Sequence, residues 1–242
     1  MPARWQAKWL QARRALDVPR AWRGVETQYL SATLRLVDDL TEHEALEALL
    51  EDSKPPMPAA AGRRQHYLLT SPFRYYPQRA SRFRPLGQHG IWYGSLELRT
   101  ACAEVAYWRM VFVRDSAPLS TREVRSQHTF FAARVRGAAI DLTAASWVAS
   151  RRIWTASDDY SGTQELAAAA VRDGVEVIRY QSVRDHGGIN LAVFTPAALR
   201  EPARGIAARE QAWTCLATNQ GVKMLRDGHS GEGFAWAARW TR

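Results

Sequence analysis

The chain has 242 residues, of which 46% are hydrophobic and 24% charged. These values are ordinary for a soluble globular protein and exclude a disordered or fibrous chain. Lys and Arg exceed Asp and Glu by 33 to 24, and the resulting formal net charge of +9 predicts an anionic partner: nucleic acid, a membrane surface or a phosphorylated small molecule.

Cysteine, histidine and hydropathy patterns narrow the class of protein. Cys102 and Cys215 are too few for a disulfide framework, so we expect two reduced, packed thiols. The six histidines never stand at the spacing of a ligand pair, so we expect no metal site. No apolar run reaches the roughly 18 residues that span a bilayer, and the N-terminus lacks the apolar region of a secretory signal. We therefore expect a cytoplasmic protein.

Residues 1–64 are predicted to form a helical N-terminal extension. Residues 1–16 are basic and contain no acid before position 17, which is compatible with a transit peptide. The simpler interpretation is an amphipathic helix with Trp5, Trp9 and Leu10 on one face.

The rest of this extension also shows helical signals. Apolar residues over 25–40 follow helical spacing. Thr41 and Glu44 form a capping-box pattern, which predicts a helix over 42–53. Residues 53–64 are rich in Pro, Ala and Gly and predict a linker.

After the linker the pattern changes to short strands alternating with helices. We predict a hairpin over 210–226, and strands over 90–95, 128–137, 175–182 and 189–196. Mixed elements with local and long connections predict an α+β fold, with residues 65–242 as its main domain.

Two helices are predicted in this domain. The first covers 98–113, and its apolar face is expected to contain Ala101, Val105, Trp108 and Phe112. The second covers 164–174, with a capping-box pattern at Ser161 and Gln164 before it and Gly174 at its C-terminal cap.

Residues 63–96 form the most unusual stretch of the sequence. The stretch has no acidic residue, seven aromatic residues, and arginines at 63, 64, 74, 79, 82 and 84. Arginine suits bidentate phosphate binding and aromatic faces stack on planar rings, so the composition favours a nucleotide ligand, either a dinucleotide or single-stranded nucleic acid. The alternative is a solvated basic loop whose aromatic residues belong to the core.

Other candidate positions are weaker when taken singly. Glu104 lies within a largely apolar helix, where it is either exposed or a functional acid. Ser182 ends an apolar strand before a Gly-rich loop, which fits a site or a plain turn. The sequence has no P-loop and no G-x-G-x-x-G motif. Residues 228–232 nearly match a nucleophile elbow, but Glu232 replaces its last glycine.

Four of these residues occur together in a recognisable pattern. Arg82, Tyr93 and Glu104 are separated by eleven residues each, and Ser182 follows Glu104 by 78. With their surroundings, PFRYYP, SRFRPLGQHGIWYGSLELRTACAEVAYWR, YQSVRD and GGINLAVF, they resemble the RES domain family, which is named for its Arg, Glu and Ser. RES proteins are commonly the toxin half of RES–Xre toxin–antitoxin pairs.

The resemblance implies a fold and an activity. The fold is similar to that of mono-ADP-ribosyltransferase toxins, with a central split mixed β-sheet. The activity is cleavage of NAD, as substrate, at the nicotinamide–ribose bond, with water, phosphate or a protein side chain as acceptor. The implied partners are an Xre-like antitoxin and, in a homodimer, a second copy of the chain.

The resemblance also carries over a set of site residues. The implied catalytic residues are Arg82, Tyr93, Glu104 and Ser182, and the implied NAD-binding residues are Arg74, Arg82, Tyr93 and Ser182. We expect Arg82 to hold the diphosphate with help from Arg74, Tyr93 to stack on nicotinamide or its ribose, and Glu104 to stabilise positive charge on the ribose. Ser182 would fix the carboxamide or orient Glu104. Many members have Gly-Arg-Trp-Asn or Gly-Arg-Phe-Asn where this chain has Arg84 as the last residue, a difference that could alter the pocket or its acceptor.

Two alternatives to an NAD-cleaving enzyme remain at this point. The +9 charge and the Arg/aromatic stretch also fit a protein that binds nucleic acid or cleaves RNA. The second alternative is an interaction module that has this fold and binds a partner without consuming NAD.

Overall fold

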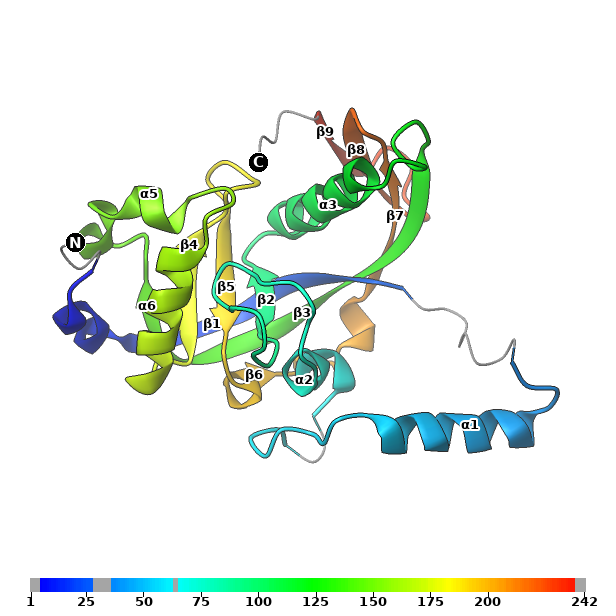
Figure 1. Cartoon of the computed structure of the whole chain (residues 1–242), viewed down its shortest axis with the longest axis horizontal. Helices are drawn as coiled ribbons and strands as arrows, with labels where there is room; N and C mark the ends of the chain where they lie inside the picture. Colours follow the sequence, from blue (N-terminus) through cyan, green and yellow to red (C-terminus); the bar gives the residue numbers. More distant parts are fainter. Residues whose placement is uncertain (1–4, 28–35, 63–64, 238–242) are drawn as a thin grey trace.

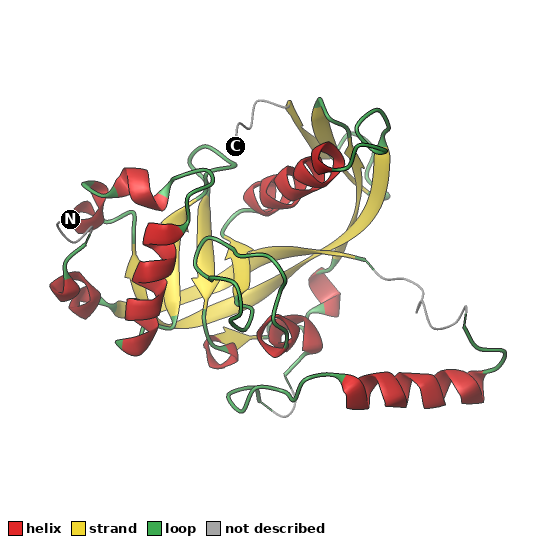
Figure 2. Ribbon diagram, in the orientation of Figure 1, coloured by secondary structure: helices red, strands yellow, loops and turns green. Residues whose placement is uncertain are grey.

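The computed structural model of the protein describes residues 5–27, 36–62 and 65–237. The strands in these ranges form one sheet: β1 (Arg14–Glu26), β2 (Trp92–Ser95), β3 (Val124–Asp141), β4 (Val177–Gln181), β5 (Ile189–Val193), β6 (Leu199–Arg200), β7 (Gln211–Ala217), β8 (Gly221–Arg226) and β9 (Gly233–Ala237). The helices are α1 (Leu40–Ser53), α2 (Tyr67–Arg74), α3 (Leu98–Asp115), α4 (Ala145–Val148), α5 (Arg151–Trp154) and α6 (Ser161–Arg172), with short 3₁₀ turns η1 (Ala7–Ala12), η3 (Pro196–Ala198) and η4 (Ala207–Arg209). Figure 2 shows α2, α3 and α6 lying against the sheet and α1 lying away from it.

The long strand β3 organises the sheet. β1, β2, β5, β4 and β3 pair in a closed ring, because β1 pairs with both β2 and β3. The first part of β3 leaves this ring and pairs with β7, which is followed by β8 and β9. β3 and β4 are parallel, and their connection runs through α4, α5 and α6, while the other described pairings are antiparallel. The sheet is therefore mixed but mostly antiparallel.

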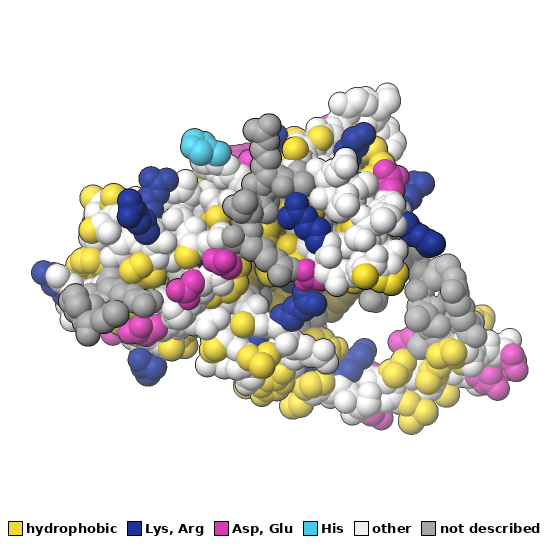
Figure 3. All heavy atoms as spheres, turned by 45° about the horizontal axis from the view of Figure 1, so that its top comes forward, with side chains coloured by type: hydrophobic (Ala, Val, Ile, Leu, Met, Phe, Trp, Pro, Cys, Tyr) yellow, Lys and Arg dark blue, Asp and Glu magenta, His cyan; other side chains and the backbone are white. Residues whose placement is uncertain are grey.

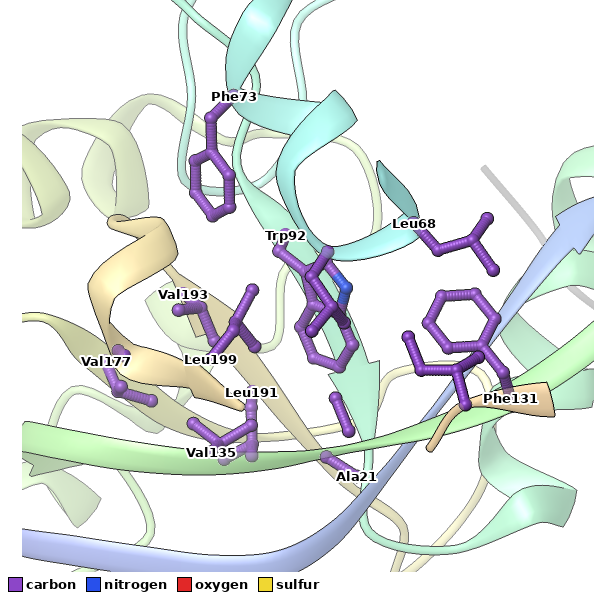
Figure 4. Packing of buried hydrophobic residues seen from close by; sticks show 14 of the residues in the cluster. Ala21, Leu68, Phe73, Trp92, Phe131, Val135, Val177, Leu191, Val193 and Leu199 are labelled. Carbon is purple, nitrogen blue, oxygen red and sulfur yellow. The ribbon is translucent and has the colours of Figure 1, made fainter. Parts of the chain in front are cut away.

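Three groups of buried side chains hold these layers together. One fills the space between α2 and the ring strands, where Trp92 lies fully buried beside Leu68 and Leu191 (Figure 4). The second packs α3 against β7 and β8. The third lies under α6 and receives Leu10 and Trp9 from η1, with Trp9 5.1 Å from the ring of Trp147.

The strands and the hairpin predicted after the linker are present. Each predicted range contains or lies within the corresponding strand to within a few residues, and β7 and β8 form the hairpin. Gly174 has φ of +80° after α6, and Val175 N–H donates to the carbonyl of Ala170, so the predicted C-terminal cap is confirmed. Both cysteines are buried and unpaired, as predicted.

The helical prediction for the N-terminal extension is wrong over Arg14–Glu26. This segment is β1, which pairs with β3 from Arg14 opposite Ala139 to Glu26 opposite His128. Long-range pairing overrides local helical spacing here, because Ala21 and Trp22 become buried only against the other strands. Residues 28–35 of the predicted 25–40 helix lie outside the described residues. The division of the chain at residue 64 stays a prediction.

Three details of the predicted helices also need correction. The N-terminal turn η1 is a 3₁₀ helix rather than an α-helix. Helix α1 begins after Asp39, whose Oδ1 accepts a hydrogen bond from Glu42 N–H at 2.8 Å. Asp39 is therefore the N-cap, and the capping box predicted at Thr41 is wrong. The capping box at Ser161 and Gln164 is also wrong, because Ser161 is already helical and Gln164 donates to the carbonyl of Ser81.

The buried face of α3 is rotated from the predicted one. The predicted stripe is only half buried: Trp108 is 45% and Phe112 47% exposed. The side chains that pack on β7 and β8 belong to a neighbouring stripe of the helix, formed by Cys102, Ala106, Met110 and Val113. Both stripes have helical spacing, so local periodicity does not decide which of them faces the sheet.

Candidate functional site

A cavity of about 360 Å³ opens between α3 and the ring of strands. Its wall combines β1, β2, β5, α3 and the loops around residues 81 and 160, so it joins segments that are far apart in the sequence. The lining side chains with polar groups are Arg23, Glu26, Ser81, Arg82, Tyr93, Ser95, Glu104, Arg109, His128, Tyr160, Tyr180, Arg184 and Asn190.

Glu104 is held in this wall by two hydrogen bonds to one oxygen. Its Oε1 accepts from Ser182 Oγ at 2.8 Å and from Asn190 Nδ2 at 2.6 Å. Ser182 Oγ in turn accepts from the backbone N–H groups of Arg184 and Asp185, both at 3.1 Å, so its hydrogen is directed to Glu104. Both donors bond to the same oxygen, and Oε2 makes no hydrogen bond to a described residue.

Asn190 is itself fixed from behind. Its Oδ1 accepts from Ser95 Oγ at 2.6 Å, and Ser95 and Asn190 are register partners on β2 and β5. The carboxylate is therefore oriented by residues of β5, of the turn after β4 and, through Asn190, of β2. All three of these supporting side chains are buried, at 4% exposure or less.

Arg23 supplies a second charge to the cavity, from β1. Its Nη1 donates to the carbonyl of Tyr93 at 3.0 Å, and its guanidinium carbon lies 5.7 Å from the ring centre of Trp92. Nε is buried and has no hydrogen-bond partner within the described chain. Burial lowers the pKa of Arg23 to about 10, so the side chain stays charged at neutral pH. Arg23 lines the cavity, and a cation in this position favours an anionic ligand.

Arg82 is anchored to the loop that follows α5. Its Nη1 donates to the carbonyls of Trp154 at 2.9 Å and Ala156 at 2.8 Å, and its guanidinium lies 4.9 Å from the ring centre of Tyr160. Its own carbonyl accepts from the hydroxyl of Thr163 in α6. Arg82 lines the cavity, and its Nε and Nη2 have no hydrogen bond to a described residue.

Tyr93 connects this loop to β2. Its hydroxyl accepts from Phe83 N–H at 3.1 Å and lies 2.9 Å from Ser81 Oγ, to which it can donate. Burial raises the pKa of Tyr93 to about 12, so its phenol is neutral. The ring thus lines the cavity while its hydroxyl holds the backbone around Arg82.

His128 lines the cavity together with Arg109 and Glu26, which form an ion pair. Its Nε2 is 2.9 Å from Ser126 Oγ, and the side chain is 2% exposed. Burial, helped by the nearby Arg109 charge, lowers the pKa of His128 to about 4. This imidazole is therefore neutral at physiological pH.

The structure brings together three of the five residues implied by the resemblance. Arg82, Tyr93 and Glu104 line the cavity, and Ser182 lies directly behind Glu104 without lining it. Arg74 is elsewhere: its guanidinium binds Glu51 at 2.6 Å and the carbonyl of Pro55.

The Arg/aromatic stretch is not a continuous basic surface over its described part. Arg84 is 3% exposed and donates to three loop carbonyls, those of Pro77, Arg79 and Pro85. The arginine that distinguishes this chain from many RES sequences therefore holds its own loop and is absent from the cavity lining.

Sequence reasoning missed the side chains that β1 and β3 contribute to the cavity. Arg23, Glu26 and His128 have no local motif, and Arg23 and Glu26 stand in the segment predicted as helical. Asn190 lies in GGINLAVF, one of the segments that resemble the RES family, but the resemblance assigns it no role. Burial along this strand alternates only over residues 15–19, which is too short a pattern to have indicated a strand of 13 residues.

Two further properties concern the described residues only. No group of three or more His, Cys, Asp or Glu side chains among them is arranged to hold a metal ion. None of their helices has the length and hydropathy to cross a membrane.

Comparison with known proteins identifies the family of the chain. Among solved structures, a chain of the toxin–antitoxin complex MbcT–MbcA of M. tuberculosis is similar at 13% identity and a TM-score of 0.47, covering 80% of this chain and 87% of its own. No curated protein matches the sequence. The sequence model of the RES domain matches residues 55–216, which include Arg82, Tyr93, Glu104 and Ser182. This chain therefore belongs to the RES domain family.

Proposed function

We propose that this RES protein cleaves NAD at the bond between ribose C1′ and the nicotinamide nitrogen. The observation that carries the proposal is the Glu104 carboxylate in the cavity wall, with Ser182 and Asn190 bonded to one oxygen and the other oxygen unused by the described chain. We further propose an ADP-ribosyltransferase-like relationship for the fold.

Glu104 acts on the charge that develops during the reaction. As the C1′–nitrogen bond breaks, its electron pair stays with nicotinamide, which leaves as a neutral molecule and needs no general acid. The ribose becomes oxocarbenium-like, and a fixed anion stabilises it. An oxygen of the acceptor then bonds to C1′ and loses its proton. Water, phosphate or a protein side chain can supply this acceptor oxygen and release its proton.

Two of the four arginines that line the cavity, Arg23 and Arg82, fit the diphosphate of the dinucleotide. Arg82 has Nε and Nη2 groups without a hydrogen bond to a described residue, and Arg23 adds a second guanidinium to the lining. Guanidinium groups bind phosphate oxygens in pairs, and both side chains line the same cavity as Glu104. Arg74 is bound to Glu51, so we give it no part in NAD binding.

Aromatic side chains offer faces for the planar groups of NAD. Tyr93 and Tyr160 line the cavity near Arg82, and Trp108 lines it from α3. We propose that Tyr93 contacts the nicotinamide or its ribose while its hydroxyl keeps the loop at Ser81 in position. Ser182 is not exposed to the cavity, so its role is to orient Glu104 rather than to bind the carboxamide.

We also propose that the protein is the toxin of a cytoplasmic toxin–antitoxin pair. NAD consumption would have to be restrained in its cell, and an Xre-like antitoxin is the partner that the family resemblance implies. The surplus of 33 basic over 24 acidic residues favours an acidic partner.

The test is nicotinamide release from NAD by the purified protein, measured by chromatography. Glu104→Gln keeps the size of the side chain and removes its charge, so we expect kcat to fall by about 10² to 10³ while the dissociation constant of NAD stays within a few fold. Ser182→Ala leaves the bond from Asn190 in place, and we expect a smaller loss of about tenfold, or about 1.4 kcal/mol.

The matched control is Glu97→Gln, which removes an exposed carboxylate next to the start of the same helix. It should release nicotinamide at the parental rate. Equal loss of NAD binding and rate in Glu104→Gln would contradict the role of Glu104. No release by the parent protein, free of copurified antitoxin and offered phosphate and a protein acceptor, would contradict NAD cleavage itself.

A further inference from the structure

Helix α1 stands away from the rest of the protein. Figure 1 shows it running outward from its C-terminal end, away from β6. None of its residues is buried, and Leu40 and Leu49 are 74% and 67% exposed. An isolated helix of 14 residues is marginal in water, so such a helix needs a surface to pack against.

The charge of this segment is opposite to that of the protein. Residues 38–54 contain one basic residue other than His, Lys54, and seven acidic residues: Asp38, Asp39, Glu42, Glu44, Glu47, Glu51 and Asp52. Figure 3 shows acidic and apolar side chains side by side on this arm. Glu44 and Asp52 are exposed and make no ion pair with a described residue.

A groove of about 880 Å³ on the ring of strands has the complementary chemistry. Part of its lining is apolar, with Pro19, Leu96, Pro202 and Ala203. The rest is mainly basic, with one acid, Glu201, against the four arginines Arg20, Arg134, Arg136 and Arg200. All four of these arginines are exposed.

Like charges face one another in this lining. Arg134 and Arg200 are direct cross-strand partners on β3 and β6, a position where like charges destabilise a sheet. Asp17 pairs with Arg134 at 2.5 Å and is the cross-strand partner of Arg136, with which it forms no ion pair, and Arg20 has no ion pair with a described residue. Four arginines against the acids Asp17 and Glu201 leave the groove with a surplus of positive charge beside an apolar surface.

We propose that the acidic helix α1 of a second copy of this chain occupies the groove. The exposed leucines of α1 would contact the apolar lining, and its unpaired carboxylates would face Arg20 and Arg136. Every copy carries one arm and one groove, so two copies related by a two-fold axis would fill both grooves. This inference is independent of NAD cleavage.

The arm is held in a position that suits a second copy better than its own groove. At its C-terminal end, Arg74 of α2 binds Glu51 at 2.6 Å and the carbonyl of Pro55, and Lys54 binds Glu51 at 2.7 Å. These contacts fix the near end of α1 to α2, while its exposed length extends away from β6 (Figure 1).

The first measurement is the molar mass of the full chain by light scattering after size exclusion, at about 0.1 M salt. We expect twice the 27.3 kDa of one chain. The groove variant Arg20→Glu/Arg136→Glu and the arm variant Glu44→Arg/Asp52→Arg should each be monomeric, with an apparent dissociation constant raised at least about 100-fold.

The decisive experiment combines the groove and arm substitutions in one chain. The charges are then exchanged, and we expect the dimer to return. The matched control is Arg122→Glu/Arg125→Glu, which makes the same change of charge near the other end of β3 and should stay dimeric. Circular dichroism of every variant checks that it is folded.

Three results would overturn the proposal. A monomeric parent at all concentrations is the first. A dimer that survives both the groove and the arm variants, or that the exchange variant does not restore, is the second. The third is an unchanged oligomeric state together with loss of binding to a generic single-stranded oligonucleotide in the groove variant, which would assign the groove to nucleic acid.

Discussion

At the scale of single residues, His128 is held neutral by its place in the cavity wall. Its pKa is lowered from 6.5 to about 4, first by burial and then by the charge of Arg109. The unfolded chain therefore binds a proton at this site between pH 6.5 and 4 that the folded chain does not. Stability is fully present above pH 6.5 and is lost as the pH falls through this window.

The His128→Gln variant tests this linkage. A shift of this size corresponds to about 3 kcal/mol of unfolding free energy lost by the parent between pH 7 and pH 4, an order-of-magnitude figure. We expect the variant to lack most of this loss, whatever its stability at pH 7. Urea unfolding at pH 7, 5.5 and 4.5 measures both slopes.

The exposed His186, replaced in the same way, is the control for this pH dependence. His186→Gln should follow the parental curve. Parallel curves for the parent and His128→Gln would show that His128 titrates normally in the folded state.

At the scale of elements, β1 must pass very close to β3 and α3 to form the cavity wall. A Cβ on Gly24 would lie 2.5 Å from Phe130 Cε1 and 2.9 Å from Val105 Cγ2. Phe130 is fully buried, so it has little room to move. Glycine at this position is therefore required by the close packing of three elements rather than by a turn.

Gly24→Ala should destabilise the protein by about 1 to 3 kcal/mol through overpacking. Thermal unfolding followed by circular dichroism measures the loss. Gly62→Ala is the matched control, since the nearest atom to its added Cβ is Gln65 Cβ at 3.9 Å. Equal midpoints for the parent and Gly24→Ala would mean that β1 shifts freely and that its contact with Phe130 is loose.

At the scale of the whole molecule, the fold needs more chain than the family match covers. Residues 55–216 exclude β1, which closes the ring by pairing with β2 and β3, and β8, which packs under α3. Without β1, Trp22 and Arg23 are absent from the cavity and the edges of β2 and β3 are exposed.

We expect a fragment of residues 55–216 to lack cooperative unfolding and to aggregate. A chain that begins at Arg13 removes η1 with Trp9 and Leu10 but keeps β1, so it should unfold cooperatively at a lower temperature than the parent. Circular dichroism and calorimetry of the two proteins make the comparison. A cooperative transition in the 55–216 fragment would contradict this view of the fold.

Signals between neighbouring residues were sufficient for much of the domain. The strand over 128–137, the hairpin over 210–226 and the glycine after α6 are predicted from local patterns, and the structure has the corresponding elements. The spacing of Arg82, Tyr93 and Glu104 was also visible in the sequence. These features were predictable because turn chemistry and periodicity act over a few residues.

The sequence by itself determined the RES pattern, the main elements after residue 64 and the acidic and basic segments of the chain. Only the tertiary structure decided that 14–26 is a strand, that Arg23, His128 and Asn190 share a cavity with Glu104, and that Arg74 does not. A strand's partners lie far along the chain, and the stripe of α3 that becomes buried depends on where β7 and β8 lie. Neither is specified by local spacing, because pairing and packing are chosen by the free energy of the whole fold.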